Sequence, residues 1–424
     1  MNLPSIMRLV RGLGVQIICY FGLFLSLTVS ARALSPDNFG IYAGAVAIAT
    51  FAGSVLTAGA DRLILQIFLR TERDGPKGMV GVTPLIPFLV VNLVALLLAA
   101  TLVASGAAEL SLLFIALLAG ATAARLVLSG YFKFITDNSA NVIATFGLQP
   151  LVVGTLFGVV LLAAPGSSGP QDVYLWMGVT LAVEAVQLAL LLRRALTAGF
   201  RVSRVRPSDP SDTVFRYVRD GLHVSLLVFF AQTGLLGVVF GTLLLAPADV
   251  GVYTVAFRVS QLILFPVIGS SQLIIPMASR RYTEDQLPQA CNEIRHTIRF
   301  SLALLVASNI GFAVLGVFLL RTVMGIADPA AYVCTLILSA GNIGMAVFGI
   351  GDQIMVAIGR QREAFWISVV SSALLFLVLA TTSFLLGYGI VGLACAAALP
   401  VTIRAIVGYI VVRRMVQVPV AAFD

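Results

Sequence analysis

The stretch LSPDNFGIY (Leu34–Tyr42) returns later in the chain as LAPADVGVY (Leu245–Tyr253), with Leu, Pro, Gly and Tyr in the same places. The second copy begins 211 residues after the first, and the same offset pairs Arg8 with Arg219 without a gap. A repeat that extends well beyond one turn predicts that the fold itself is duplicated. In each copy we interpret the Pro as the end of one helix and the Gly as the residue that allows a tight reversal of the chain.

The composition indicates that the duplicated unit is embedded in lipid. Of the 424 residues, 59% are hydrophobic and only 11% are charged, whereas a soluble domain carries roughly 25% charged residues. Hydrophobic runs of about 20 residues recur, and each is long enough to cross a hydrocarbon layer of about 30 Å as a helix. Because a spanning backbone must satisfy its own polar groups, we expect helices.

We therefore predict an all-α, polytopic integral membrane protein with about twelve transmembrane helices in two parallel six-helix lobes. The first six spans are expected at Leu13–Ala31, Phe39–Ala60, Val82–Ala104, Ser111–Tyr131, Val142–Ala163 and Tyr174–Leu192. The second six are expected at Leu222–Leu243, Val250–Ala278, Ile298–Leu320, Ala331–Ile354, Ala364–Leu386 and Ile390–Val412.

The basic residues predict the orientation of these spans. With the N-terminus in the cytosol, only Arg32 and Arg321 of the 27 Lys and Arg fall in outside loops, and Arg125, Arg258 and Arg404 fall within spans. The other 22 lie on the cytosolic side, as the positive-inside rule requires. The net charge of +8 therefore indicates membrane topology rather than nucleic-acid binding, and cytosolic arginines could also contact anionic lipid heads. Both termini are expected in the cytosol.

An even number of spans per copy means that both copies enter the membrane from the same side, as parallel repeats. We expect an N-terminal lobe at 1–193, a polar cytosolic linker at 194–216 and a C-terminal lobe at 217–424. Parallel repeats commonly bind substrate between the halves. The four cysteines and two histidines are too scattered for a metal site, so we predict neither a metal nor a cofactor.

Three segments resemble the polysaccharide transporter family of the multidrug, oligosaccharidyl-lipid and polysaccharide exporter superfamily. They are ALSPDNFGIYAGAVAIATFAGSVLTAGADR (Ala33–Arg62), AIGRQREAFW (Ala357–Trp366) and GYGIVGLACAAAL (Gly387–Leu399). The resemblance implies a flippase that moves undecaprenyl-diphosphate-linked oligosaccharide across the bacterial inner membrane, for O-antigen, capsule or exopolysaccharide assembly. It implies as partners the lipid-linked oligosaccharide, membrane lipids and polysaccharide polymerase machinery, and it supplies no catalytic motif.

Polar residues within the spans are the candidate substrate-binding residues, because a polar group in lipid is costly and usually faces protein or water. The eighth span carries a polar stripe at spacings of three and four, and the 211-residue offset places a second stripe on the second span. We predict that these two stripes form opposite walls of one cavity between the lobes. The full candidate set is Arg258, Gln261, Gln272, Thr50, Ser54, Asp61, Arg125 and Asn342.

This candidate set fits an anionic sugar-diphosphate head group, because guanidinium groups hold phosphate oxygens bidentately and amides and hydroxyls can bond sugar hydroxyls. Several charged residues can also be explained without a role in cargo binding. Arg258 could pair with a buried acid, and Arg125 and Asp352 could lie at the cytosolic interface. Glu184, a central carboxylate, could carry a proton, although pairing with a neighbouring helix is favoured.

The main alternative is a drug or cation antiporter of the same superfamily. By the same resemblance, such transporters bind cations with buried carboxylates, and the predicted first span contains no acid. A membrane glycosyltransferase or polymerase is a further alternative, but it would need paired acids, a metal site or a sizeable external loop. We therefore predict a transporter and not an enzyme.

Overall fold

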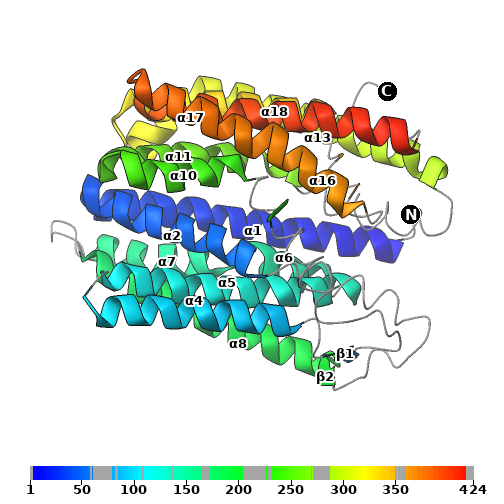
Figure 1. Cartoon of the computed structure of the whole chain (residues 1–424), viewed down its shortest axis with the longest axis horizontal. Helices are drawn as coiled ribbons and strands as arrows, with labels where there is room; N and C mark the ends of the chain where they lie inside the picture. Colours follow the sequence, from blue (N-terminus) through cyan, green and yellow to red (C-terminus); the bar gives the residue numbers. More distant parts are fainter. Residues whose placement is uncertain are drawn as a thin grey trace. The chain divides into compact units, whose positions relative to one another are not determined.

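The computed structural model describes residues 3–57, 60, 79–81, 85–106, 109–135, 137–163, 172–203, 226–227, 232–268, 270, 287–348, 351, 355 and 360–416. Helices dominate this part of the chain (Figure 1). The exception is a small parallel ribbon between β1 (Met79–Gly81) and β2 (Arg201–Ser203), in which Val80 is paired with Val202. The predicted all-α class is confirmed, with this ribbon as the addition.

The helices overlap each predicted span. In the first half they are α1 (Leu3–Ala33), α2 (Pro36–Leu56), α4 (Ile86–Ala104), α5 (Leu110–Phe134), α6 (Asn138–Phe146), α7 (Gln149–Ala163) and α8 (Val173–Thr197). In the second half they are α10 (Thr233–Leu244), α11 (Pro247–Ile263), α13 (Leu287–Phe318), α14 (Pro329–Phe348), α16 (Gln361–Ser368), α17 (Leu375–Leu385) and α18 (Gly389–Val416). Two π-helical segments, η2 (Leu319–Val323) and η3 (Val369–Leu374), continue α13 and join α16 to α17.

Length and apolar composition make these helices suitable for a bilayer. Among the described residues, eight helices are long and apolar enough to span a membrane, and the bent pair α6 and α7 brings the number to nine. The shorter apolar stretches Phe88–Ala104 and Thr233–Leu244 add further candidates. The chain is therefore a multi-pass membrane protein, as predicted.

One predicted span differs from the structure, and the predicted linker is described only in part. The fifth span was expected to be one helix over Val142–Ala163, but α6 and α7 meet at an angle of 67°. The linker was expected at 194–216, and the structure places the end of α8 at Thr197 and β2 after it. Residues 204–216 of the predicted linker lie outside the described residues.

The chain divides into two compact units, one with Met1–Asn38 and Ala45–Phe229 and the other with Phe39–Gly44 and Phe230–Asp424. In the first unit, α5 packs against α4, α6 and α8, and α1 packs against α6 and α7. In the second unit, α18 packs against α10, α14 and α17, and α14 also contacts α11 and α13. The predicted lobe boundaries and the rotation that relates the lobes stay predictions.

The repeated turn forms the same local structure in both copies. Pro36 and Pro247 each occupy the first position of a helix, after a residue with extended backbone. The preceding helix closes in the same way, since Leu34 N–H donates to Ser30 O at 3.0 Å and Leu245 N–H donates to Gly241 O at 2.8 Å. The Pro at the helix start, the extended residue before it and the backbone hydrogen bond that ends the preceding helix all recur at the 211-residue offset. The repeat seen in the sequence is therefore present in the backbone of this turn.

Our interpretation of the two key residues in that turn was wrong. Each Pro begins the next helix, where its fixed φ is suitable and its missing N–H costs nothing. Gly40 lies inside α2 and does not reverse the chain. Its role is close packing, because a Cβ at Gly40 would overlap the carbonyl group of Pro247. Gly251, its repeat equivalent, packs against Phe39 and Gly40 in turn.

Candidate functional site

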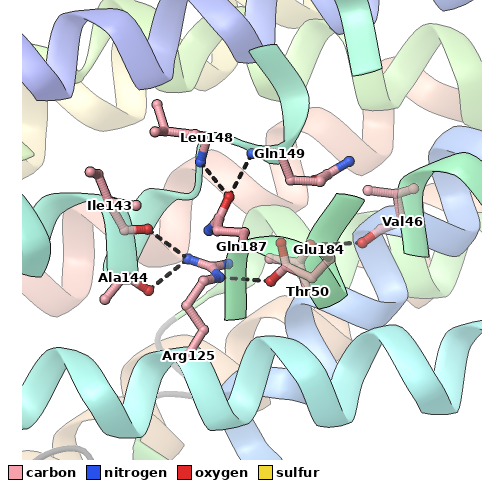
Figure 2. A network of polar contacts seen from close by, with 9 residues as sticks. All are labelled: Val46, Thr50, Arg125, Ile143, Ala144, Leu148, Gln149, Glu184 and Gln187. Atoms are coloured by element: carbon pink, nitrogen blue, oxygen red, sulfur yellow. Dashed lines mark hydrogen bonds and ion pairs between the residues drawn. The ribbon is translucent and has the colours of Figure 1, made fainter. Parts of the chain in front are cut away.

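A buried ion pair joins α5 to α8 in the first unit. Arg125 Nε donates to Glu184 Oε1 at 2.7 Å, and the two side chains are only 7% and 2% exposed. Arg125 also donates from Nη1 to the carbonyl oxygen of Ala144 at 2.6 Å, and that of Ile143 lies at 3.5 Å. Figure 2 shows the guanidinium between these carbonyl groups and the carboxylate. The charge of Arg125 is thus compensated within the protein.

The ion pair lies at the break between α6 and α7. Gly147, at the end of α6, has φ of 81° and ψ of 146°, a conformation that only Gly adopts readily. On the other side of the break, Gln187 Oε1 accepts hydrogen bonds from Leu148 N–H at 2.8 Å and Gln149 N–H at 2.7 Å. Gln187 comes from α8, one turn beyond Glu184. Side chains of α5 and α8 therefore bond backbone groups on both sides of the break (Figure 2).

Small residues bring α2 close to this network. A Cβ at Gly53 would contact the side chain of Thr122 at 2.8 Å and the carbonyl group of Ala119 at 2.9 Å, so α2 and α5 are in close contact there. Thr50 lies one turn before Gly53, and Figure 2 draws it in the same polar network. Its hydroxyl donates to Val46 O at 2.7 Å, and Ser54 donates to Phe51 O at 2.7 Å. Both predicted hydroxyls thus bond their own helix.

In the second unit, the predicted residues lie on α11 and α14. Arg258 and Gln261 are half-buried on α11, and the guanidinium of Arg258 lies 5.8 Å from the ring centroid of Phe257. Asn342 on α14 is 6% exposed, and its amide donates to Ser260 O at 3.3 Å. The amide therefore ties α14 to the helix that carries Arg258.

The predicted residues thus separate into two groups and a remainder. Arg125, Thr50 and Ser54 belong to the first unit, while Arg258, Gln261 and Asn342 belong to the second. Asp61, Gln272 and Asp352 lie outside the described residues. The predicted cavity between the lobes stays a prediction.

Sequence reasoning identified Arg125 as a candidate but left its partner open, and it missed Gln187 altogether. Arg125 is buried because it has an internal acid, Glu184, and the pairing of Glu184 with a neighbouring helix is confirmed. The segment GLQP, from Gly147 to Pro150 in the middle of an apolar run, was an available signal for a helix break. Nothing in the sequence indicated that Gln187 would satisfy it.

The arrangement offers hydrogen bonds and one compensated charge pair rather than reactive groups. Among the described residues, no cluster of three or more His, Cys, Asp or Glu could hold a metal ion. A buried pair of this kind is costly to form and costly to disrupt, because each ion left alone would be unsolvated. The site is therefore suited to holding helices in defined positions.

These features define a multi-pass, two-unit helical membrane protein with a broken helix in its first unit, and solved structures share its fold over nearly the whole chain. An outward-facing multidrug resistance MATE family transporter of the MOP superfamily has TM-score 0.64 and 15% identity, with 97% of this chain and 95% of that chain covered. A MATE transporter of Vibrio cholerae has TM-score 0.62 and 13% identity, with 97% of each chain covered.

A third structure has a different functional description. The MOP superfamily transporter from Pyrococcus furiosus, described as having a binding pocket of reverse polarity, has TM-score 0.61 and 14% identity, with 97% of this chain and 95% of that chain covered. No protein-family model matches the chain, and no curated protein sequence matches it. At these identities, the similarity establishes the fold.

Proposed function

We propose that this protein is a membrane transporter that works by alternating access, with its two halves exposing an internal site to each side of the membrane in turn. The observation that carries the proposal is the fold, which is shared with transporters over 97% of the chain. The duplicated turn supports it, because parallel repeats commonly bind substrate between halves that rock around it. We further propose that the protein lies in a bacterial inner membrane with both termini in the cytosol.

The comparisons favour a drug or cation antiporter, with drugs or cations as the cargo. Two of the three structures named above are MATE transporters, and one of these is described as a multidrug resistance protein. An antiporter of cations would need carboxylates that can bind a cation or a proton. Glu184 is compensated by Arg125, so this function would depend on other acids.

A specific observation keeps the lipid-linked oligosaccharide flippase as a second candidate. The central carboxylate Glu184 is compensated by Arg125, and a second arginine, Arg258, lies half-buried on α11. A guanidinium can hold a diphosphate bidentately, which fits an undecaprenyl-diphosphate head group. In this candidate function, polysaccharide polymerase machinery would use the exported product.

Reconstitution into proteoliposomes tests both candidates with the same preparation. An antiporter should move ethidium against its gradient when a proton or sodium gradient is imposed. A flippase should move a fluorescent undecaprenyl-diphosphate sugar to the opposite leaflet, as measured by its protection from dithionite. Activity in the first assay alone would establish the antiporter, activity in the second alone would establish the flippase, and activity in neither would contradict the proposal for these cargo classes.

A further inference from the structure

At the break between α6 and α7, backbone groups that would bond one another in a continuous helix bond side chains of other helices instead. In a continuous helix, Leu148 N–H would donate to Ala144 O and Gln149 N–H would donate to Thr145 O, four residues earlier. In the structure, Arg125 donates to Ala144 O instead, and Gln187 accepts from both amides. The side chains of two neighbouring helices therefore replace the internal hydrogen bonds that the bend removes.

This exchange removes one cost of bending the span, because three backbone groups at the break are not left without partners. A backbone group without a partner in lipid costs several kcal/mol, but here the carbonyl of Ala144 and the amides of Leu148 and Gln149 have a partner in either arrangement. Local sequence favours the bend, because Pro150 lacks an N–H and its ring would crowd the carbonyl of Phe146 in a helix. A Pro-kinked continuous helix is nevertheless common in membranes, where neighbours satisfy the freed groups.

We propose that the break at Gly147 is a hinge with two states, held in the bent state by Arg125 and Gln187, and that Glu184 fixes the hinge by holding Arg125 in place. In the second state, α6 and α7 form one kinked helix with its own hydrogen bonds restored. That the hinge serves transport rests on the proposed function, whereas the hinge itself rests on the hydrogen bonds above. Releasing the clamp then changes the direction of α7 relative to α5 and α8.

The packing around the break allows such a movement to be measured. α7 has 15 residues and so is about 22 Å long, and a change of about 20° at the break would move its far end by about 8 Å. Leu162, near that end, is 82% exposed, and Leu110 at the start of α5 is 55% exposed. Both positions can carry a spin label without disturbing the core. Leu175 on α8, which is 47% exposed, provides a reference position outside the hinge.

The experiment is a double electron–electron resonance measurement on the full-length protein in lipid nanodiscs, with labels at 110 and 162. Gln187→Met removes the acceptor for the two amides at similar volume, and Pro150→Ala removes the obstacle to a continuous helix. We expect a second distance, shifted by several ångströms, in each variant and most strongly in the double variant. The reference pair at 110 and 175 should keep one distance throughout.

Asn92→Leu is the matched control, because Asn92 donates to Leu56 O at 2.9 Å and so satisfies the end of a different helix in the same unit. It should leave the distance between 110 and 162 unchanged. If Gln187→Met fails to fold, Pro150→Ala decides alone, since it leaves the buried hydrogen bonds of Arg125 and Gln187 in place and still favours the continuous state by removing the obstacle to it. A single unchanged distance in the folded variants would overturn the hinge, and because the readout is a distance, a failed transport assay would not affect this result.

Discussion

At the scale of residues, Arg125 and Glu184 show how burial changes the meaning of a charged side chain. Both are buried, their contact is 2.7 Å long, and Arg125 also donates to a helix end. Removal of one partner leaves an uncompensated charge in a low-dielectric environment, which costs about 3–5 kcal/mol. Removal of both, with apolar replacements, is often neutral. Substitutions of Arg125 and Glu184 can therefore distinguish a structural role of the pair from a role in cargo binding.

We predict that Arg125→Ala and Glu184→Ala each lower stability by about 3–5 kcal/mol, and that the double replacement by Leu recovers most of the loss. Thermal unfolding in detergent and the amount of protein in the membrane measure this. Arg194→Ala is the control, because its pair with Asp137 is partly exposed at 46% and 24% and should contribute at most about 1 kcal/mol. Export lost by a stable Arg125→Ala variant would instead indicate a role in cargo binding.

Arg258 is the residue whose charge we expect to matter for an anionic cargo. Arg258→Ala should abolish flipping of the fluorescent undecaprenyl-diphosphate sugar while protein level and insertion stay normal. Arg258→Lys should restore only part of it, because an ammonium cannot make the bidentate contact. Normal flipping by Arg258→Ala would remove this residue from the mechanism, and loss of both flipping and protein would favour a structural pair with an acid.

The roles of individual residues could be predicted from the sequence only in part. Polar residues in apolar runs identified Arg125, Glu184 and Asn342 as interior groups, because lipid excludes such groups. Their partners depend on helix packing, and Arg125 meets an acid that is 59 residues away along the chain. The sequence contains no local signal for a contact of that range, so the choice between cargo and partner could not be made from it.

At the scale of elements, the broken span depends on Gly147 and the repeated turn depends on close helix packing. The repeat was predictable because its offset is free of gaps, and the structure reproduces it at Pro36 and Pro247. The function of Gly40 was not predictable, since a Gly that serves a turn and a Gly that serves packing look the same in one sequence. Only the position of Pro247 distinguishes them.

Gly147→Ala should destabilise the protein by about 1–3 kcal/mol, because a side chain is strained in this backbone conformation. A Cβ there would also approach Gln187 Nε2 at 3.4 Å. Thermal unfolding in detergent measures the effect. Gly178→Ala is the matched control, since a Cβ at that helical position would meet nothing within 4 Å. Equal stability of the two variants would show that the break tolerates a side chain.

Gly40→Ala should also destabilise the protein, because the new methyl group would overlap the backbone carbonyl of Pro247, which cannot rotate away as a side chain does. The start of α2 or the start of α11 would have to move, and overpacking of this kind typically costs about 1–3 kcal/mol. Gly311→Ala is the control, with nothing within 4 Å of its Cβ. Unfolding temperatures of the two purified variants give the comparison, and an unchanged Gly40→Ala protein would contradict the packing role.

At the scale of the whole molecule, composition was sufficient to predict the class. A chain with 59% hydrophobic and 11% charged residues can satisfy its backbone in lipid only as helices or as a closed barrel, and the apolar runs have the length of helices. The composition does not determine the cargo in the same way. Cargo specificity depends on which few polar groups reach the transport path, and those groups differ among proteins of one fold.

The proposed alternating access requires that the polar interior opens to each side of the membrane in turn. A single cysteine at Gln261, in a background without reactive cysteines, should react with a membrane-impermeant maleimide added from either side of sealed vesicles. Leu315 on α13, which is 61% exposed and expected to face lipid, should react from neither side. Labelling of position 261 from both sides is the result that alternating access predicts, and labelling from only one side under all conditions would contradict it.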